Sequence, residues 1–170
     1  MKLKSLMKKL NESDDFKDWQ KKNKNSYLSH VFNMDDKINK DIWQIGYYNA
    51  DNDTMTNFVI DKEEIKVASD LEIFKKDNKI NELVLKKVKI DIDKADKTAR
   101  DFQKDNYPSE IAMMRILVLQ NLEKVEQVYN ITFVTHSLKI LNIKIDANNG
   151  KAILHNLSSV TDFNFDKIKK

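Results

Sequence analysis

The spacing of apolar residues near the start of the chain is helical. The apolar positions within Leu3–Leu10 recur at intervals of three and four residues, so they share one face of a helix. The opposite face carries Lys4, Lys8 and Lys9. Ser13 is a good N-cap, because a serine side chain can accept a backbone N–H of the first helical turn. We therefore predict a break at residues 11–13 and a second helix that ends by residues 23–25.

Beyond residue 26 the apolar period falls to two, which is typical of strands. Trp43, Ile45 and Tyr47 alternate with polar or small neighbours, and this predicts a strand with one buried face. The side chains of Trp43 and Tyr47 are therefore expected in the core, whereas Tyr48 lies on the other face. The same alternation predicts further strands at residues 28–32, 54–61 and 65–67.

The second half of the chain also begins with a helical pattern and continues with strands. Asp91 or Asp93 is a suitable N-cap, and Tyr107-Pro108 predicts the helix end, since the residue before proline is pushed out of the helical region. Asn149-Gly150 is a strong hairpin signal, because both residues tolerate positive φ. The strands predicted in this half are residues 113–120, 128–135, 138–146 and 151–156.

The two halves align when one is shifted by 86 residues. Residues 42–48 then match residues 128–134 with their apolar positions in phase, and Asp15-Phe16 matches Asp101-Phe102. This correspondence predicts an α+β fold of two helix-plus-antiparallel-sheet repeats, either separate or packed as one unit. The alternative is one continuous α+β domain.

The repeat hypothesis divides the chain into three parts. The first α+β repeat, with its N-terminal amphipathic helix, is expected at residues 1–76. Residues 77–90 are a lysine-rich connector, and the second α+β repeat occupies residues 91–170.

A resemblance to a known family centres on residues 92–154. The helix with Ala95 and Ala99, the strand Tyr129-x-Ile131-x-Phe133 and the hairpin Ile145-Asp146-Ala147-Asn148-Asn149-Gly150-Lys151 resemble the PepSY module, first noted in propeptides of thermolysin-like peptidases. The resemblance implies cystatin-like packing of helix against sheet in a non-catalytic binding module. The first repeat departs from this motif, since Asp61 is followed by no glycine.

Composition excludes several classes of site. The chain of 170 residues has no Cys and only two Gly, which excludes a disulfide scaffold, a Cys-ligated metal centre and a Gly-rich phosphate loop. No apolar run is long enough to span a membrane. The absence of a secretory signal pattern and of cysteine predicts a cytoplasmic protein.

Charge is unevenly spread although the net charge is only +3. Residues 1–24 hold eight Lys against four acids, while the central part of the chain is mildly acidic. Basic ends on an acidic body argue against a nucleic-acid footprint over the whole surface.

No catalytic constellation, metal site or cofactor site is evident. The three histidines, at positions 30, 136 and 155, have no ligating partner at helical spacing, and no carboxylate stands alone in an apolar run. We therefore expect a non-catalytic binding or protein-interaction module without a cofactor. Its partner would be a protein or peptide, including a second copy paired through sheet edges.

The candidate interaction surface consists of Lys4, Lys8, Lys9 and Tyr48. Two alternatives stay open at this stage. One is a nucleic-acid-binding protein that uses the lysine-rich N-terminal helix, and the other is a small-ligand carrier with a pocket between helix and sheet.

Overall fold

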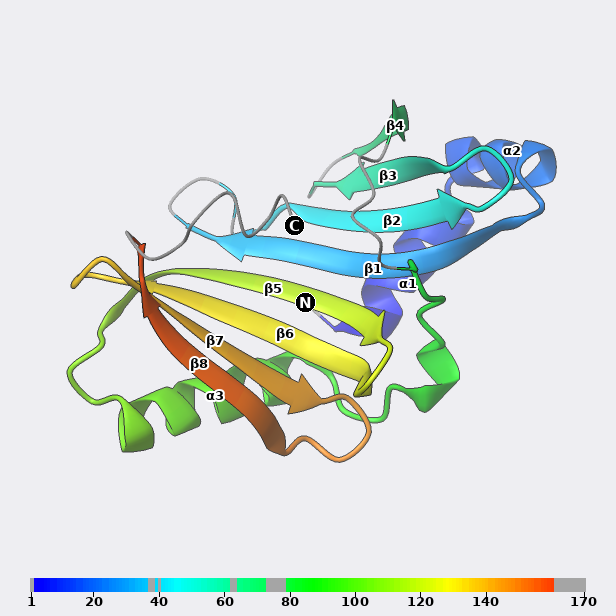
Figure 1. Cartoon of the computed structure of the whole chain (residues 1–170). Coiled ribbons are helices and arrows are strands. Elements are labelled where there is room, and N and C mark those ends of the chain that lie inside the picture. The colour runs from blue at the N-terminus through cyan, green and yellow to red at the C-terminus, as the bar shows by residue number, and fades with distance from the viewer. Residues whose placement is uncertain (1, 37–38, 40, 62–63, 73–78, 161–170) are drawn as a thin grey trace.

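The strands of both chain halves hydrogen-bond side by side in one antiparallel sheet (Figure 1). The computed structural model describes residues 2–36, 39, 41–61, 64–72 and 79–160. Within these residues the sheet has eight strands in the order β4-β3-β2-β1-β5-β6-β7-β8. The strands are β1 (Ser26–Asp35), β2 (Trp43–Asn49), β3 (Thr54–Ile60), β4 (Ile65–Glu72), β5 (Ala112–Leu122), β6 (Glu126–Thr135), β7 (Lys139–Asp146) and β8 (Ala152–Ser159).

The helices begin where the sequence places their caps. In the described part of the chain they are α1 (Leu3–Glu12), α2 (Asp14–Lys22) and α3 (Ile92–Asn106). The Ser13 hydroxyl accepts the N–H of Phe16 at the start of α2, and an Asp91 carboxylate oxygen accepts the N–H of Ile92 at the start of α3. That Asp91 oxygen also accepts the N–H of Leu3 at 2.9 Å, so one side chain holds the first turns of α1 and α3 together.

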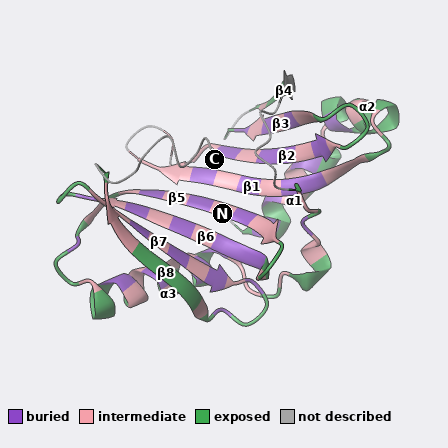
Figure 2. Ribbon diagram, in the orientation of Figure 1, coloured by how far each residue is buried: buried purple, intermediate pink, exposed green. Residues whose placement is uncertain are grey.

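The core lies between the helices and one face of the sheet. Figure 1 shows α1 and α2 behind one end of the sheet and α3 behind the other. Burial alternates along the strands, as Figure 2 shows, because successive side chains point to opposite faces. One continuous cluster of buried side chains contains residues of all three helices and of both groups of strands. The aromatic residues predicted for this core are there: Trp43 is buried, and Tyr47 packs with Phe16, Trp19 and Phe58.

The prediction of two cystatin-like helix-plus-sheet repeats is wrong. Strand β1 pairs with β5 from His30 opposite Gln120 to Asp35 opposite Arg115, so the strands form one sheet. Alternation within each strand says which face is buried but does not say which strands become neighbours. The predicted repeat ends include residues 73–78 and 161–170, which lie outside the described residues.

The connector packs closely against the sheet. The N–H of Leu83 donates to the carbonyl of Leu28 at 2.8 Å, and the Leu83 side chain is buried. A 3₁₀ turn, η1 (Leu85–Lys87), follows Leu83 in the chain. The apolar members of this segment contact the core, so its lysines are left on the outside.

Candidate functional site

Strand β8 is a sheet edge without charged side chains. Its sequence, AILHNLSS, has no Lys, Arg, Asp, Glu or Pro, although 34% of the chain is charged. It pairs with β7 on one side, and among the described residues no strand pairs with its other side. Ile153 is 38% exposed and Leu154 48% exposed. Natural edge strands are usually blunted by charges or proline, so β8 is an open place for another strand to pair.

A bulge marks only the beginning of β8. The register shifts between Lys144 and Ile145 of β7, which lie opposite Leu154 and Ala152. Beyond this point, pairing is regular from Leu154 to Ser159. The part of the edge that is regular enough to accept a partner strand therefore spans these six residues.

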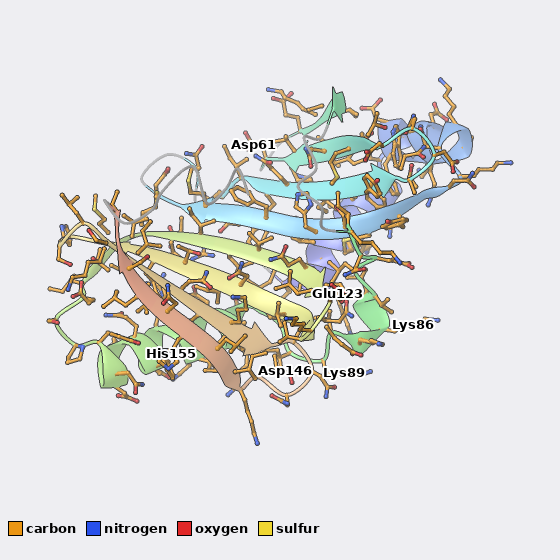
Figure 3. The ribbon with its side chains drawn as sticks, in the orientation of Figure 1. Asp61, Lys86, Lys89, Glu123, Asp146 and His155 are labelled. Carbon is orange, nitrogen blue, oxygen red and sulfur yellow. The ribbon has the colours of Figure 1, made fainter. Side chains whose placement is uncertain are left out.

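Contacts with α3 hold β8 in place. Within the part of the chain that is described, the His155 ring of β8 lies 5.0 Å from the Phe102 ring, and its Nδ1 is 2.7 Å from the Tyr107 hydroxyl (Figure 3). Leu157 packs against the core from the same side of the strand. Because one face of β8 is fixed by these contacts, a partner strand would meet an edge that is already ordered.

The opposite edge of the sheet is protected by charge. Strand β4 carries Lys66 at its exposed start, where the ammonium group lies 2.5 Å from the Glu64 carboxylate. The hydrogen bond that the Lys66 ammonium donates to Glu64 raises the pKa of Lys66, so this charge persists at neutral pH. The two edges therefore differ, and β8 is the one suited to pairing.

The predicted surface of Lys4, Lys8, Lys9 and Tyr48 is not one patch. Lys4 and Lys8 line a groove of about 550 Å³ along α1, whereas the ammonium of Lys9 donates to the carbonyl of Asp61 at 2.6 Å. Tyr48 is 3% exposed, and its hydroxyl donates to a carboxylate oxygen of Asp53 at 2.7 Å. The tyrosine ring is therefore part of the interior and not of an exposed surface.

Most of the surface that lines the groove beside α1 is apolar. Leu3 and Met7 of the helix face Leu85 and Val88 of the connector across it. A second hollow, of about 540 Å³, lies farther along the same helix and is lined by the side of β1. Both hollows offer space next to α1, as the small-ligand alternative requires.

Buried ionic groups belong to the framework of the fold. Arg115 of β5 is 9% exposed, and its Nη2 donates to the Asn33 amide oxygen. Its Nε lies 3.1 Å from an Asp96 carboxylate oxygen without the alignment of a hydrogen bond. Desolvation lowers the pKa of Arg115, while the charges of Asp96 and Asp35 oppose that shift. This network ties α3 to the β1–β5 junction.

Glu110 forms a second buried cluster with nearby donors. The ammonium of Lys139 and the hydroxyls of Ser137 and Thr135 donate to its carboxylate. These hydrogen bonds, that of Lys139 first, lower the pKa of Glu110, so it stays ionised at neutral pH. Because these donors occupy its oxygens and lower its pKa, the carboxylate is a weak proton acceptor.

The histidines also lack a catalytic or metal-binding arrangement in the described part of the chain. Burial lowers the pKa of His30, whose Nδ1 is 2.9 Å from the Ser29 hydroxyl. Among the described residues no group of three or more His, Asp or Glu side chains could hold a metal ion. No helix within the described ranges is long and apolar enough to cross a bilayer.

Comparison with known proteins gives a likeness of fold alone. A search of protein families found no model that matches the chain, and a search of curated proteins found no match either. One solved structure, that of a "putative lipoprotein" from Clostridium difficile 630, is similar with a TM-score of 0.57 and 14% identity, over 85% of this chain and 91% of that chain. At this identity the likeness concerns the fold, and the resemblance to PepSY modules stays a prediction.

Proposed function

We propose that this chain is a non-catalytic protein-interaction module that pairs through β8 with a second copy of itself. The observation that carries the proposal is the uncharged edge from Leu154 to Ser159 in a chain with 34% charged residues. Main-chain hydrogen bonds would supply the affinity, as in other cases of strand addition.

A second copy matches this edge better than a charged peptide does. A two-fold axis at the middle of β8 would pair the strand with itself in antiparallel order, which is the geometry of a self-complementary dimer interface. No like charges would then face each other across the new strand pair. Ile153 and Leu154, both exposed in the single chain, would lose water-accessible surface in the pair.

The nucleic-acid alternative has less support from the helices. Within the described residues Lys8 lies 3.7 Å from Glu12, Lys17 lies 3.0 Å from Asp14, and Lys21 lies 2.8 Å from Asp18. These pairs reduce the positive charge that α1 and α2 present to a phosphate backbone.

The cytoplasmic location predicted from the sequence is part of this proposal. The similar protein of Clostridium difficile 630 is called a "putative lipoprotein", and lipoproteins are held at membranes. This name belongs to that protein and not to the present chain. Fractionation of native cells separates the two possibilities, because an anchored protein stays with membranes washed in high salt and a cytoplasmic one does not.

Size-exclusion chromatography with light scattering over a range of protein concentrations tests the pairing. We expect a monomer–dimer equilibrium that Leu154→Lys weakens by about tenfold, because a lysine side chain on an edge strand opposes pairing with another strand. Ile111→Lys is the matched control, since Ile111 is 63% exposed and lies outside the edge. It should leave the equilibrium unchanged.

Hydrogen exchange of the backbone amides shows which strand lies in the contact between the two copies. The backbone amides of β8 should gain protection as the concentration of wild-type protein rises, while those of β4 should not. A mass that stays monomeric up to about 1 mM protein would refute the proposal. A dimer that persists in Leu154→Lys and weakens in Ile111→Lys would place the interface elsewhere.

A further inference from the structure

A hollow lined by four lysines lies at the end of the sheet away from the β6–β7 turn. Its volume is about 600 Å³, and its walls come from the connector, from the β5–β6 turn and from the end of β7 with the turn that follows. Figure 3 shows Lys86, Lys89 and Asp146 at this end of the molecule. The lysines are Lys86, Lys87, Lys89 and Lys124.

The connector turns its lysines toward this hollow because its apolar residues are held by the core. Leu85, Val88 and Ile90 pack against the buried cluster, and the N–H groups of Lys89 and Ile90 both donate to the carbonyl of Ala147. The backbone that carries Lys89 is thereby fixed to the β7–β8 turn.

Acidic side chains at the hollow are already engaged. The carboxylate of Glu126 lies 3.2 Å from the ammonium of Lys87. One carboxylate oxygen of Asp146 accepts the N–H of Asn148 at 2.7 Å, and the other accepts the side-chain amide of Asn149 at 2.7 Å. These carboxylates therefore have partners of their own.

Three lysines of the hollow have no such partner. No hydrogen bond or ion pair joins the side-chain ammonium group of Lys86, Lys89 or Lys124 to another described residue. The four lysines outnumber the two carboxylates that line the hollow, so an anion bound among the ammonium groups would lower the free energy of the folded chain.

A buried amide provides an independent sign of a missing acceptor. Gln127 lines the same hollow and is only 4% exposed. Its side-chain oxygen accepts the N–H of Val84 at 3.0 Å, whereas its Nε2 is buried with no hydrogen-bond partner among the described residues. A buried donor without an acceptor costs about 1–3 kcal/mol, so a ligand of the hollow that brought an acceptor to this amide would remove that cost.

We propose that this hollow binds a small molecule that carries phosphate groups. Ammonium groups are common point-charge partners of phosphate, and the free groups here are all donors. A hollow of about 600 Å³ exceeds what one inorganic phosphate fills and lies in the range typical of small-ligand sites. The site involves no residue of β8, so it is independent of the proposed self-association.

Calorimetric titration with pyrophosphate at constant ionic strength tests the site. We expect a Kd below about 1 mM, weakened about fivefold by each of Lys86→Gln and Lys89→Gln through loss of one charge contact. Lys104→Gln is the matched control, since Lys104 is an exposed lysine of α3 outside the hollow. It should bind pyrophosphate as the wild-type protein does.

The amide of Gln127 gives a second readout that does not depend on these variants. In a ¹H–¹⁵N spectrum its side-chain NH₂ signals should shift on addition of pyrophosphate and not on addition of matched sodium chloride. Gln127→Glu keeps a side-chain oxygen that accepts the N–H of Val84 but replaces the unpartnered NH₂ group by an anionic oxygen. This oxygen would repel phosphate, so the variant should not bind pyrophosphate.

Three results would overturn the proposal. One is the absence of binding at about 1 mM pyrophosphate. Another is an equal loss of affinity in Lys104→Gln, which would indicate a non-specific effect of charge. The third is RNA binding whose affinity rises with oligonucleotide length and depends on the same lysines, which would assign the hollow to a polynucleotide. Leu154→Lys should still bind pyrophosphate, so this test and the test of β8 can fail separately.

Discussion

Replacing Gly46 by alanine tests how closely β1 and β2 approach on the face of the sheet opposite the helices. Gly46 of β2 lies opposite His30 of β1, and the imidazole ring covers the glycine. A Cβ atom at Gly46 would lie 2.1 Å from Cε1 and 2.6 Å from Nδ1 of His30, where ordinary contacts are 3.4–4 Å. The ring must therefore move by more than an ångström.

The cost follows from what the ring loses when it moves. Overpacking of this kind costs about 1–3 kcal/mol. The hydrogen bond between His30 Nδ1 and the Ser29 hydroxyl, 2.9 Å long, contributes about 1 kcal/mol more if it breaks. Alanine also lowers the entropy of the unfolded chain. Because φ at Gly46 is not in the left-handed region and alanine can adopt it, this effect stabilises the folded protein by about 0.4–1 kcal/mol. Gly46→Ala should thus lower the free energy of unfolding by about 2 kcal/mol.

The sign of the effect should reverse when the ring is absent. In a His30→Ala background the new Cβ meets no imidazole, so Gly46→Ala should raise stability by about 0.5 kcal/mol. Urea unfolding followed by tryptophan fluorescence measures all four proteins of this cycle, since Trp43 is buried and Trp19 packs against the core. An equal cost of Gly46→Ala in both backgrounds would show that His30 is not the obstacle and would refute the reasoning.

Two further predictions concern pH and helix capping. Burial lowers the folded-state pKa of His30 below its ordinary 6.5, so the unfolded chain binds the proton more readily than the folded chain does. The free energy of unfolding should therefore fall as the pH drops below about 6.5. His30→Gln should reduce the pH dependence of the urea-unfolding midpoint measured from pH 8 to 5.5. Unchanged pH dependence in His30→Gln would assign the effect to other groups. Asp91→Ala should cost about 1–2 kcal/mol, because the N–H groups of Leu3 and Ile92 both lose their acceptor, and hydrogen exchange should quicken in the first turns of α1 and α3. Asp93→Ala, next to the cap on the exposed side of α3, is its control.

Local structure could be predicted from the sequence because its signals lie within a few residues. Ser13 caps α2 and Tyr107 follows the last residue of α3, as their side chains and the following proline indicate. Gly150 has φ +79° in the β7–β8 turn, where the Asn-Gly pair predicts a tight hairpin. Alternation of apolar residues identified the strands and most of the core by the same local logic.

The chemistry of the molecule depended on contacts between distant parts of the chain. The lysines of the hollow come from two segments, and the unpartnered amide of Gln127 arises because its oxygen is used by Val84, 43 residues away. The predicted surface was not preserved, since Tyr48 is held inside by Asp53 and Lys9 is drawn to the β3–β4 turn. A charge pattern in one dimension does not show which groups will already have partners.

The amino-acid sequence by itself determined approximately where the helices and most strands lie and which of their residues form the core, because these depend on caps, turns and periods within one segment. Only the tertiary structure decided that β1 pairs with β5, which makes one sheet of eight strands among the described residues. It thereby left β8 as an uncharged edge and brought the connector lysines beside the β5–β6 and β7–β8 turns. Strand neighbours depend on the packing of residues about 80 positions apart, for which a period along the chain carries no information.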